Sequence, residues 1–472
     1  MLVLPVGRHP SGVQLSDLRH AQTLQASTLH ALSEQLASGQ VTSRALVETC
    51  LARIAEADGE GARVFPHGAS QRALDDADAQ DRLRSQGRAA SPFAGIPISI
   101  KDNVDQAGEV TRAGSRLLET DAPAAADAPV LARLRAAGFV AIGRTVMTEL
   151  AFSGLGLNPH FGTPANPRSP EVRRIPGGSS SGAAVSVAAG MAYAAVGTDT
   201  GGSCRIPAAF CGLVGFKPTA ARVPREGVFP LSTTLDCVGS LGLSAACCAV
   251  MDAVMAGTPD AELPAVAPAS LRLAALGGYV LDDLEPEVAE AYQTALARLR
   301  DAGVQIEPLQ LDALTEVGTI NARGGFSSAE LYGRLQLRLA DEAGKLDPRV
   351  LRRVMMGAEH NAEAYRGFHT ARAGLIARTA EALDRFDAVL TPTTPMVAPP
   401  FEALQQDADY DRINRLALRN PSIANMLDRC AITLPCEPAQ GLPVGLSLMG
   451  RRGGDRDLLA IAVSLEEIAR GR

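Results

Sequence analysis

The sequence predicts an α/β fold, because stretches of helical periodicity are repeatedly followed by a short apolar strand. Over residues 126–143, apolar side chains recur at helical spacing up to Gly138, and an apolar run then forms the expected strand. The same order of helix and strand recurs over 287–306 and 371–390. Helices and strands that alternate at this length are typical of α/β proteins.

The remaining elements fit the same class. A helix is expected over residues 28–57, with Thr42 and Ser43 as candidate caps. We further predict a buried strand at 97–100, a buried helix in the apolar run 183–196, a strand at 444–448 and a helix at 455–469.

Domain organisation is predicted to be simple. The proline-containing stretch 258–270 is expected to be a surface connection, at which the catalytic core gives way to a peripheral helical portion of about 260–385. No internal repeat or low-complexity linker forces a second domain. Residues 1–472 are therefore expected to form one domain.

Composition and charge exclude several classes of function. The chain is 46% hydrophobic and 21% charged, which is a globular composition, and its net charge of −7 argues against a nucleic-acid-binding surface. The eight cysteines show no paired C-x-x-C spacing, so no metal site is expected. The N-terminus lacks the features of a secretory leader, and the run 183–196 is shorter than the ~20 residues of a membrane span. We therefore expect a cytoplasmic protein that binds neither nucleic acid nor a membrane.

Residues 176–219 carry the strongest chemical signal. Glycines and serines cluster at 177–182 and again at 201–203, with a helix of small residues between the clusters. Glycine lets the backbone approach a ligand closely, and successive free N–H groups in such a loop form an anion-binding nest. An enzyme that transfers acyl groups needs such a nest for the oxyanion of its intermediate.

These segments resemble the amidase signature family. The stretch from Gly177 reads GGSS…GTDTGGS-x-R-x-PA…G-x-x-GFKPT, and an upstream block at 95–103 reads GIPISIKDN. The resemblance is strongest over about 93–220 and returns at 385–450 in the segments TPTTP and LP-x-GL-x-LMG. It implies one large domain built on a mixed, twisted β-sheet that helices cover on both faces.

The resemblance also implies roles for individual residues. Ser203 is implied as the nucleophile and Lys101 as the base. Ser179 is implied as the relay serine, with a cis peptide bond to Gly178. The implied oxyanion hole consists of the backbone N–H groups of Thr200, Gly201, Gly202 and Ser203. The implied supporting residues are Asp199, Arg205 and Ser180. No metal or organic cofactor is implied.

A physical argument stands beside this resemblance. A serine hydroxyl is a poor nucleophile until a base takes its proton, and none of the seven histidines lies near either motif. Lys101 directly follows the apolar run 98–100, which is expected to carry it into the interior. Because burial disfavours a charged ammonium, Lys101 is expected to become neutral readily enough to act as the base.

Two other nucleophiles are less consistent with the sequence. Residues 178–182 fit the G-x-S-x-G nucleophile elbow with Ser180 at its centre, but the charged stretch 173–176 stands where that elbow needs a strand. Cys204 follows the predicted nucleophile, yet no group that would activate its thiol is evident. We interpret Cys204 as a packing residue.

Hydrolysis of a small or aryl amide is the first functional prediction. Carbamate, urethane and biuret-type bonds present the same carbonyl chemistry and are an alternative. A second alternative is the glutamine-hydrolysing component of a tRNA-dependent amidotransferase. A non-catalytic scaffold is disfavoured because the three triad residues are all intact. The expected partner is a small-molecule amide or carbamate, and the sequence leaves the oligomeric state open, a homodimer included.

The sequence does not identify the substrate pocket. The segment 238–243 lacks the Gly-Pro and basic residue that many family members have there, and we expect it near a loop that shapes the substrate mouth. Several apolar side chains in flanking segments are candidates for the acyl pocket, although core packing explains each of them more readily. They are Met147, Phe152, Leu155, Phe229 and Met426.

Overall fold

The computed structural model describes residues 27–259, 262–436 and 441–471. The strands in these ranges are β1 Pro97–Lys101, β2 Val140–Thr145, β3 Ala194–Asp199, β4 Val214–Lys217, β5 Cys237–Gly242, β6 Arg272–Leu276, β7 Gln305–Leu309, β8 Ala388–Pro392, β9 Ala431–Pro435 and β10 Gly445–Met449. They form one sheet in the order β2-β1-β3-β5-β4-β9-β10-β8-β6-β7.

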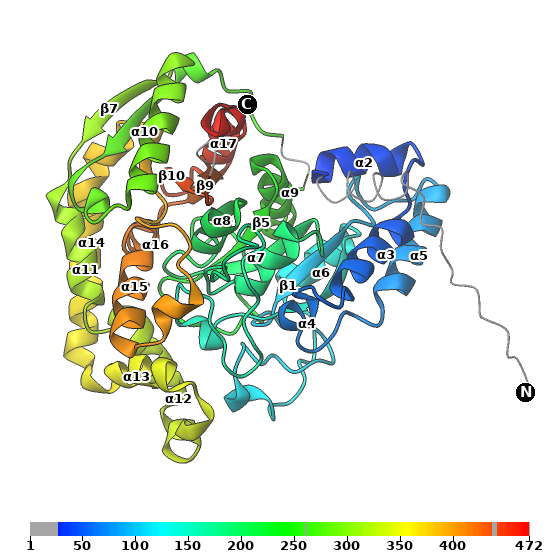
Figure 1. Ribbon diagram of the computed structural model, residues 1–472, viewed down its shortest axis with the longest axis horizontal. Helices are drawn as coiled ribbons and strands as arrows, with labels where there is room; N and C mark the ends of the chain where they lie inside the picture. The colour runs from blue at the N-terminus through cyan, green and yellow to red at the C-terminus, as the bar shows by residue number, and fades with distance from the viewer. Residues whose placement is uncertain (1–26, 260–261, 437–440, 472) are drawn as a thin grey trace, which may run out of the picture.

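Helices surround this sheet (Figure 1). Their bounds are α2 Leu29–Ala37, α3 Ser43–Ile54, α4 Gly61–Val64, α5 Ala73–Ser85, α6 Pro129–Ala136, α7 Ser181–Ala188, α8 Arg205–Cys211, α9 Ala245–Ala256, α10 Pro286–Asp301, α11 Thr315–Asn321, α12 Gly325–Glu342, α13 Pro348–Met355, α14 Ala362–Asp384, α15 Asp407–Arg419, α16 Ser422–Met426 and α17 Asp455–Arg470. In the view of Figure 1, α2, α3 and α5 lie on one side, α10, α11 and α14 lie on the other, and α7, α8 and α9 lie between them.

The sheet is mixed, as predicted. Strand β1 pairs in parallel with β2 and β3, and β6 pairs in parallel with β7 and β8. The pairs between these two parallel groups, from β3–β5 to β10–β8, are antiparallel. The α/β class and the mixed sheet expected from the sequence are therefore confirmed.

The two faces of the sheet bury different helices. On β3, Ala194 and Val196 pack into the core that includes α9, whereas Ala195 packs on the opposite side against α7 and α8. This alternation follows from the two-residue period of a strand. Helices consequently cover both faces.

The same alternation in β1 directs a lysine toward α7. Ile98 and Ile100 belong to the apolar core on one face. Ser99 points the other way, and its Oγ lies 2.8 Å from Ser186 Oγ on α7. Lys101, two residues after Ser99, shares that face.

The predicted helix over 28–57 is in fact two helices. Helix α2 ends before Gly39, whose φ of 72° is a left-handed conformation that glycine adopts readily. Thr42 then caps α3, and its hydroxyl accepts a hydrogen bond from Ala45 N at 3.1 Å. The expected cap was therefore correct, and the expectation of one continuous helix was wrong.

The apolar run 183–196 also needs a correction, because it is not one helix. It divides between α7 and β3 on either side of a turn at Gly190, where φ is 69°. Both parts are apolar because they are buried within the sheet and its helical cover.

The segment 238–243 forms most of the buried central strand β5. Its place in the sheet explains why it is apolar and rich in small residues. The segment therefore cannot shape a substrate site itself, and any such role belongs to the loop that precedes β5.

The portion at about 260–385 is helical only in part. Its described residues include α10 to α14, but they also supply β6 and β7 to the edge of the sheet. The connection before it contains a short turn at Pro268–Ser270, and residues 260 and 261 lie outside the described ranges. None of the helices in the described ranges has the length and apolar character needed to cross a membrane.

Close packing at the start of α7 yields a stability prediction. A Cβ added at Gly182 would lie 2.6 Å from the carbonyl oxygen and 2.9 Å from the amide nitrogen of Val146, which are backbone atoms that cannot move aside cheaply. Gly182→Ala is therefore expected to lower the free energy of unfolding by about 1–3 kcal/mol, as overpacking does. The measurement is the denaturant midpoint. As the matched control, Gly333→Ala adds a methyl group to exposed α12 with no atom within 4 Å, and is expected to raise stability by about 0.5–1 kcal/mol. Equal stability of the two variants would contradict the prediction.

Candidate active site

Strand pairing brings the two sequence motifs together. Strands β1 and β3 run in parallel, with Ile100 opposite Val196. Because parallel strands end at the same edge of a sheet, the residues that follow, Lys101 and Thr198, emerge next to each other. Both side chains are buried.

The Lys101 ammonium group lies in a buried polar pocket. Its Nζ is 2.8 Å from Ser179 Oγ and 2.7 Å from Thr198 Oγ1. The side chain is fully buried, and burial lowers the pKa of Lys101 to about 8, although nearby acidic groups act in the opposite direction. A large fraction of Lys101 is therefore neutral in mildly alkaline solution, as a general base must be.

The loop before α7 places the serines. The peptide bond between Gly178 and Ser179 is cis, as the resemblance implied. The next residue, Ser180, donates its N–H to the carbonyl oxygen of Ser203 at 3.3 Å and its hydroxyl to the carbonyl oxygen of Thr198 at 3.3 Å. Ser180 thus joins the two serine-containing loops, and the structure brings Ser179 and Ser203 to the same site as Lys101.

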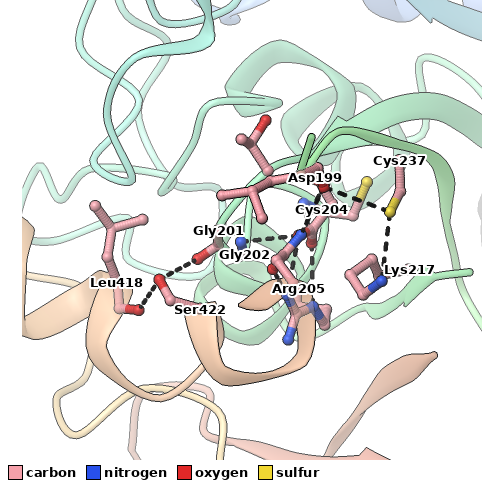
Figure 2. Close-up of polar contacts among 12 residues, drawn as sticks. Asp199, Gly201, Gly202, Cys204, Arg205, Lys217, Cys237, Leu418 and Ser422 are labelled. Atoms are coloured by element: carbon pink, nitrogen blue, oxygen red, sulfur yellow. Dashed lines mark hydrogen bonds and ion pairs between the residues drawn. The ribbon is translucent and has the colours of Figure 1, made fainter. Parts of the chain in front are cut away.

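The loop that follows β3 is shaped by one buried carboxylate (Figure 2). Asp199 accepts hydrogen bonds from Gly202 N at 2.8 Å and Cys204 N at 3.1 Å, and it forms a bidentate ion pair with Arg205 at 2.9 and 3.1 Å. Burial opposes ionisation of Asp199, but the charge and hydrogen bonds of Arg205 outweigh it and lower the pKa of Asp199 to about 2. The carboxylate is therefore ionised at neutral pH.

This arrangement divides the N–H groups of the glycine-rich loop. Gly202 N–H, expected among the oxyanion donors, donates to Asp199 instead. The N–H groups of Thr200, Gly201 and Ser203 have no hydrogen-bond acceptor among the described residues, and these three residues line a cavity. They are the donors that remain available for a bound anion.

Two residues at this loop had no signal in the sequence. Asn425, on α16, donates to Asp199 Oδ1 at 3.0 Å and accepts from Arg205 at 2.7 Å. Asp236 accepts from Thr200 Oγ1 at 2.5 Å, and burial raises the pKa of Asp236 to about 6. Asn425 lies 226 positions from Asp199, so no local pattern could have identified it.

Cys204 has the packing role that was predicted for it. Its side chain is fully buried, and Cβ atoms placed on Gly197 and Gly239 would lie 2.9 and 3.1 Å from its sulfur. Burial raises the pKa of this thiol well above its ordinary value, so the reactive thiolate is disfavoured.

A cavity of about 840 Å³ opens at the predicted nucleophile. Ser203 and the glycine-rich loop form one wall, and residues of α11, α13, α15 and α16 contribute to the others. Leu231 and Leu235, in the loop before β5, also line it, so the expectation of a substrate-shaping loop beside 238–243 agrees with the cavity.

The apolar pocket candidates divide into two groups. Phe152 and Met426 line the cavity, whereas Met147, Leu155 and Phe229 pack in apolar clusters. Among the described residues, no three His, Cys, Asp or Glu side chains gather in a way that could hold a metal ion.

Comparison with known proteins places this geometry in a family. Residues 45–459 match the family model described as Amidase. The chain is 36% identical over 433 residues to 2-amino-5-chloromuconic acid deaminase of Comamonas testosteroni, covering 91% of this chain and 93% of that protein. It is 34% identical over 474 residues to one component of the glutamyl-tRNA(Gln) amidotransferase of Moorella thermoacetica, covering 93% and 96%. The crystal structure of an amidase superposes with a TM-score of 0.82 at 30% identity, covering 93% of this chain and 99% of the other.

The lowered pKa of Lys101 predicts how Ser203 reactivity depends on pH. Below pH 8 Lys101 is mostly protonated and cannot accept a proton, so the rate at which phenylmethanesulfonyl fluoride modifies Ser203 is expected to rise with pH, with a midpoint near 8. The measurement is intact-protein mass against time from pH 6 to 10. Lys101→Met is expected to abolish the rise. A wild-type rate that does not change across this range would contradict the assignment of Lys101 as the base.

Proposed function

Because this chain belongs to the amidase family, we propose that it hydrolyses the C–N bond of a small amide through an acyl-enzyme on Ser203. The observation that carries the proposal is the contact of 2.8 Å between the buried Lys101 Nζ and Ser179 Oγ, beside the loop that holds Ser203. A buried lysine with a lowered pKa, in contact with a serine, is a base and its relay.

Proton transfer through the triad follows from this arrangement. Neutral Lys101 accepts the proton of Ser179 while Ser179 accepts the proton of Ser203. Ser203 Oγ then attacks the carbonyl carbon of the amide. When the C–N bond breaks, the proton returns through Ser179 to the leaving nitrogen, and water hydrolyses the acyl-enzyme to release the acid and restore Ser203.

The oxyanion forms against the glycine-rich loop. The N–H groups of Thr200, Gly201 and Ser203 face it, because Gly202 N–H is held by Asp199. Such donors stabilise the negative charge that develops on the carbonyl oxygen. Asp199 and Arg205 act by fixing the loop and do not contact the substrate.

One cavity residue favours an acidic substrate. The Arg353 guanidinium lies 4.3 Å from the centroid of the Phe152 ring and donates one hydrogen bond, at 3.0 Å, to the Phe152 carbonyl oxygen. Among the described residues it forms no ion pair with a carboxylate, although it lines the cavity and is half-buried. A guanidinium with free donors is well suited to bind a substrate carboxylate. The C. testosteroni relative is named for an acid substrate, which agrees with this assignment.

Other C–N substrates use the same machinery. Carbamates and urea-type compounds present the same carbonyl carbon, the M. thermoacetica relative belongs to an amidotransferase, and the C. testosteroni relative is a deaminase. The identities to these two relatives, 34% and 36%, do not separate the alternatives, so substrates must be compared directly.

The first test compares substrates on the purified chain. Ammonia or amine release is measured with aliphatic amides, anilides, aryl carbamates, glutamine and 2-aminomuconate. Turnover by the wild type and its loss in Ser203→Ala, by at least about 10³-fold, are expected because the nucleophile is removed. Ser327→Ala, a serine on another wall of the cavity, is the matched control and is expected to retain activity. Turnover that survives in Ser203→Ala would refute the mechanism, and slow release from glutamine alone would indicate a missing partner protein.

The second test concerns substrate charge. Arg353→Met is expected to raise KM about 10- to 100-fold for amides that carry a carboxylate, since a charge-assisted hydrogen bond is lost, with little change for neutral amides. Arg415→Met removes another arginine from the same cavity and is the control for a general change of charge. Equal effects of Arg353→Met on charged and neutral amides would contradict a carboxylate site at Arg353.

A further inference from the structure

Thr198 surrounds the base with oxygen atoms. Its hydroxyl Oγ1 is 2.7 Å and its carbonyl oxygen is 3.5 Å from Lys101 Nζ. Ser179 Oγ, at 2.8 Å, is the third oxygen around the same nitrogen. Thr198 is itself fixed, because it lies in β3, opposite Val238 of β5, and is 4% exposed.

A neighbouring amide determines what the Thr198 hydroxyl can accept. Asn103 Nδ2 donates to Thr198 Oγ1 at 3.1 Å and lies 3.5 Å from the carbonyl oxygen of Phe229. That carbonyl can only accept a hydrogen bond, so it fixes which end of the Asn103 amide carries the donors. A hydroxyl oxygen has two lone pairs, and Thr198 Oγ1 therefore has one left for an N–H of Lys101.

Counting donors around Lys101 gives the orientation of its lone pair. A neutral amine has two N–H groups and one lone pair. If the hydroxyl and carbonyl of Thr198 take the two N–H groups, the lone pair is directed at the remaining oxygen, Ser179 Oγ. That is the orientation in which Lys101 can accept the Ser179 proton. After proton transfer, the three N–H groups of the ammonium have three oxygen acceptors.

We propose that Thr198 is a positioning residue that binds both N–H groups of neutral Lys101 and thereby directs its lone pair at Ser179. This inference rests on the proposed function, because it concerns the base of the same proton relay. No substrate atom is involved, and Thr198 acts only through Lys101.

The charged groups around Lys101 are held by other partners. Asp199 is paired with Arg205, Asp236 is bound by Thr200, and Asp102 is paired with Arg144 at 3.1 Å. The Cys204 thiol, which also faces Lys101, is kept neutral by burial, which raises its pKa. None of these groups bonds to the Thr198 hydroxyl, so a substitution at Thr198 changes the hydrogen bonds of Lys101 and leaves these charges in place.

The test compares Thr198→Val with Thr198→Ser. Valine has the shape of threonine without the hydroxyl, whereas serine keeps the hydroxyl. In Thr198→Val, the modification of Ser203 by phenylmethanesulfonyl fluoride is expected to slow about 10- to 100-fold, because a hydrogen bond to a charged group is lost. The midpoint of its pH profile is expected to fall by about one pH unit, since the ammonium form loses an acceptor. Thr198→Ser is expected to stay within about twofold of the wild type in rate, with the wild-type midpoint.

The outcomes separate this inference from the proposed function. If wild-type Ser203 is not modified at any pH, both the proposed function and the role of Thr198 are refuted. If the wild type is modified with a midpoint near 8 and Thr198→Val matches it in rate and midpoint, only the role of Thr198 is refuted. A thermal melt checks folding, and Thr198→Ala, which places no methyl group against Nζ, serves if the valine variant does not fold. Thr198→Ala must then be slower than Thr198→Ser, and equality of the two would also refute the proposal.

Discussion

The buried Asp199 carboxylate is the constraint on which the rest of the site depends. It binds two backbone N–H groups of the glycine-rich loop, the Arg205 guanidinium and the Asn425 amide. A buried charge is tolerated only when it is paired and hydrogen-bonded, so these partners are required for Asp199 to remain ionised inside the protein. By holding Gly202 N–H, the carboxylate sets the turn of the loop and leaves neighbouring N–H groups exposed to the cavity.

The chemistry and the substrate contacts come from different parts of the chain. Lys101, Ser179 and Ser203 lie on β1 and on the loops that flank α7 and β3, close to the centre of the sheet. Much of the cavity wall away from Ser203 comes from α11, α13, α15 and α16, which follow much later in the sequence. Because the two sets of residues are separate, the wall can vary in charge and shape while the proton relay stays the same. This separation is consistent with relatives that are named for different reactions.

Sequence reasoning predicted the fold class and the local motifs well, for identifiable reasons. The apolar run before Lys101 predicted its burial, because a buried strand alternates its side chains between two covered faces. Helix and strand order could be predicted from periodicity, but the break at Gly39 could not, since the flanking residues fit one helical pattern. Asn425 and Arg353 reach the site through tertiary packing, and nothing in their neighbouring residues signals this. Distance in the sequence, more than residue type, determined what was missed.

A second carboxylate, Glu330 on α12, links the cavity wall to the glycine-rich loop. It holds the turn 231–236, and the hydrogen bonds it accepts outweigh burial and lower its pKa. Leu231 and Leu235 of this turn line the cavity, and Asp236 at its end binds Thr200. The donors to Glu330, at 2.5 to 3.1 Å, are the hydroxyls of Ser232, Thr233, Thr234 and Tyr365 and the Thr234 N–H. A displacement of α12 would therefore move the cavity wall and the Asp236–Thr200 contact together, which explains how residues far from Ser203 can fix the geometry around it.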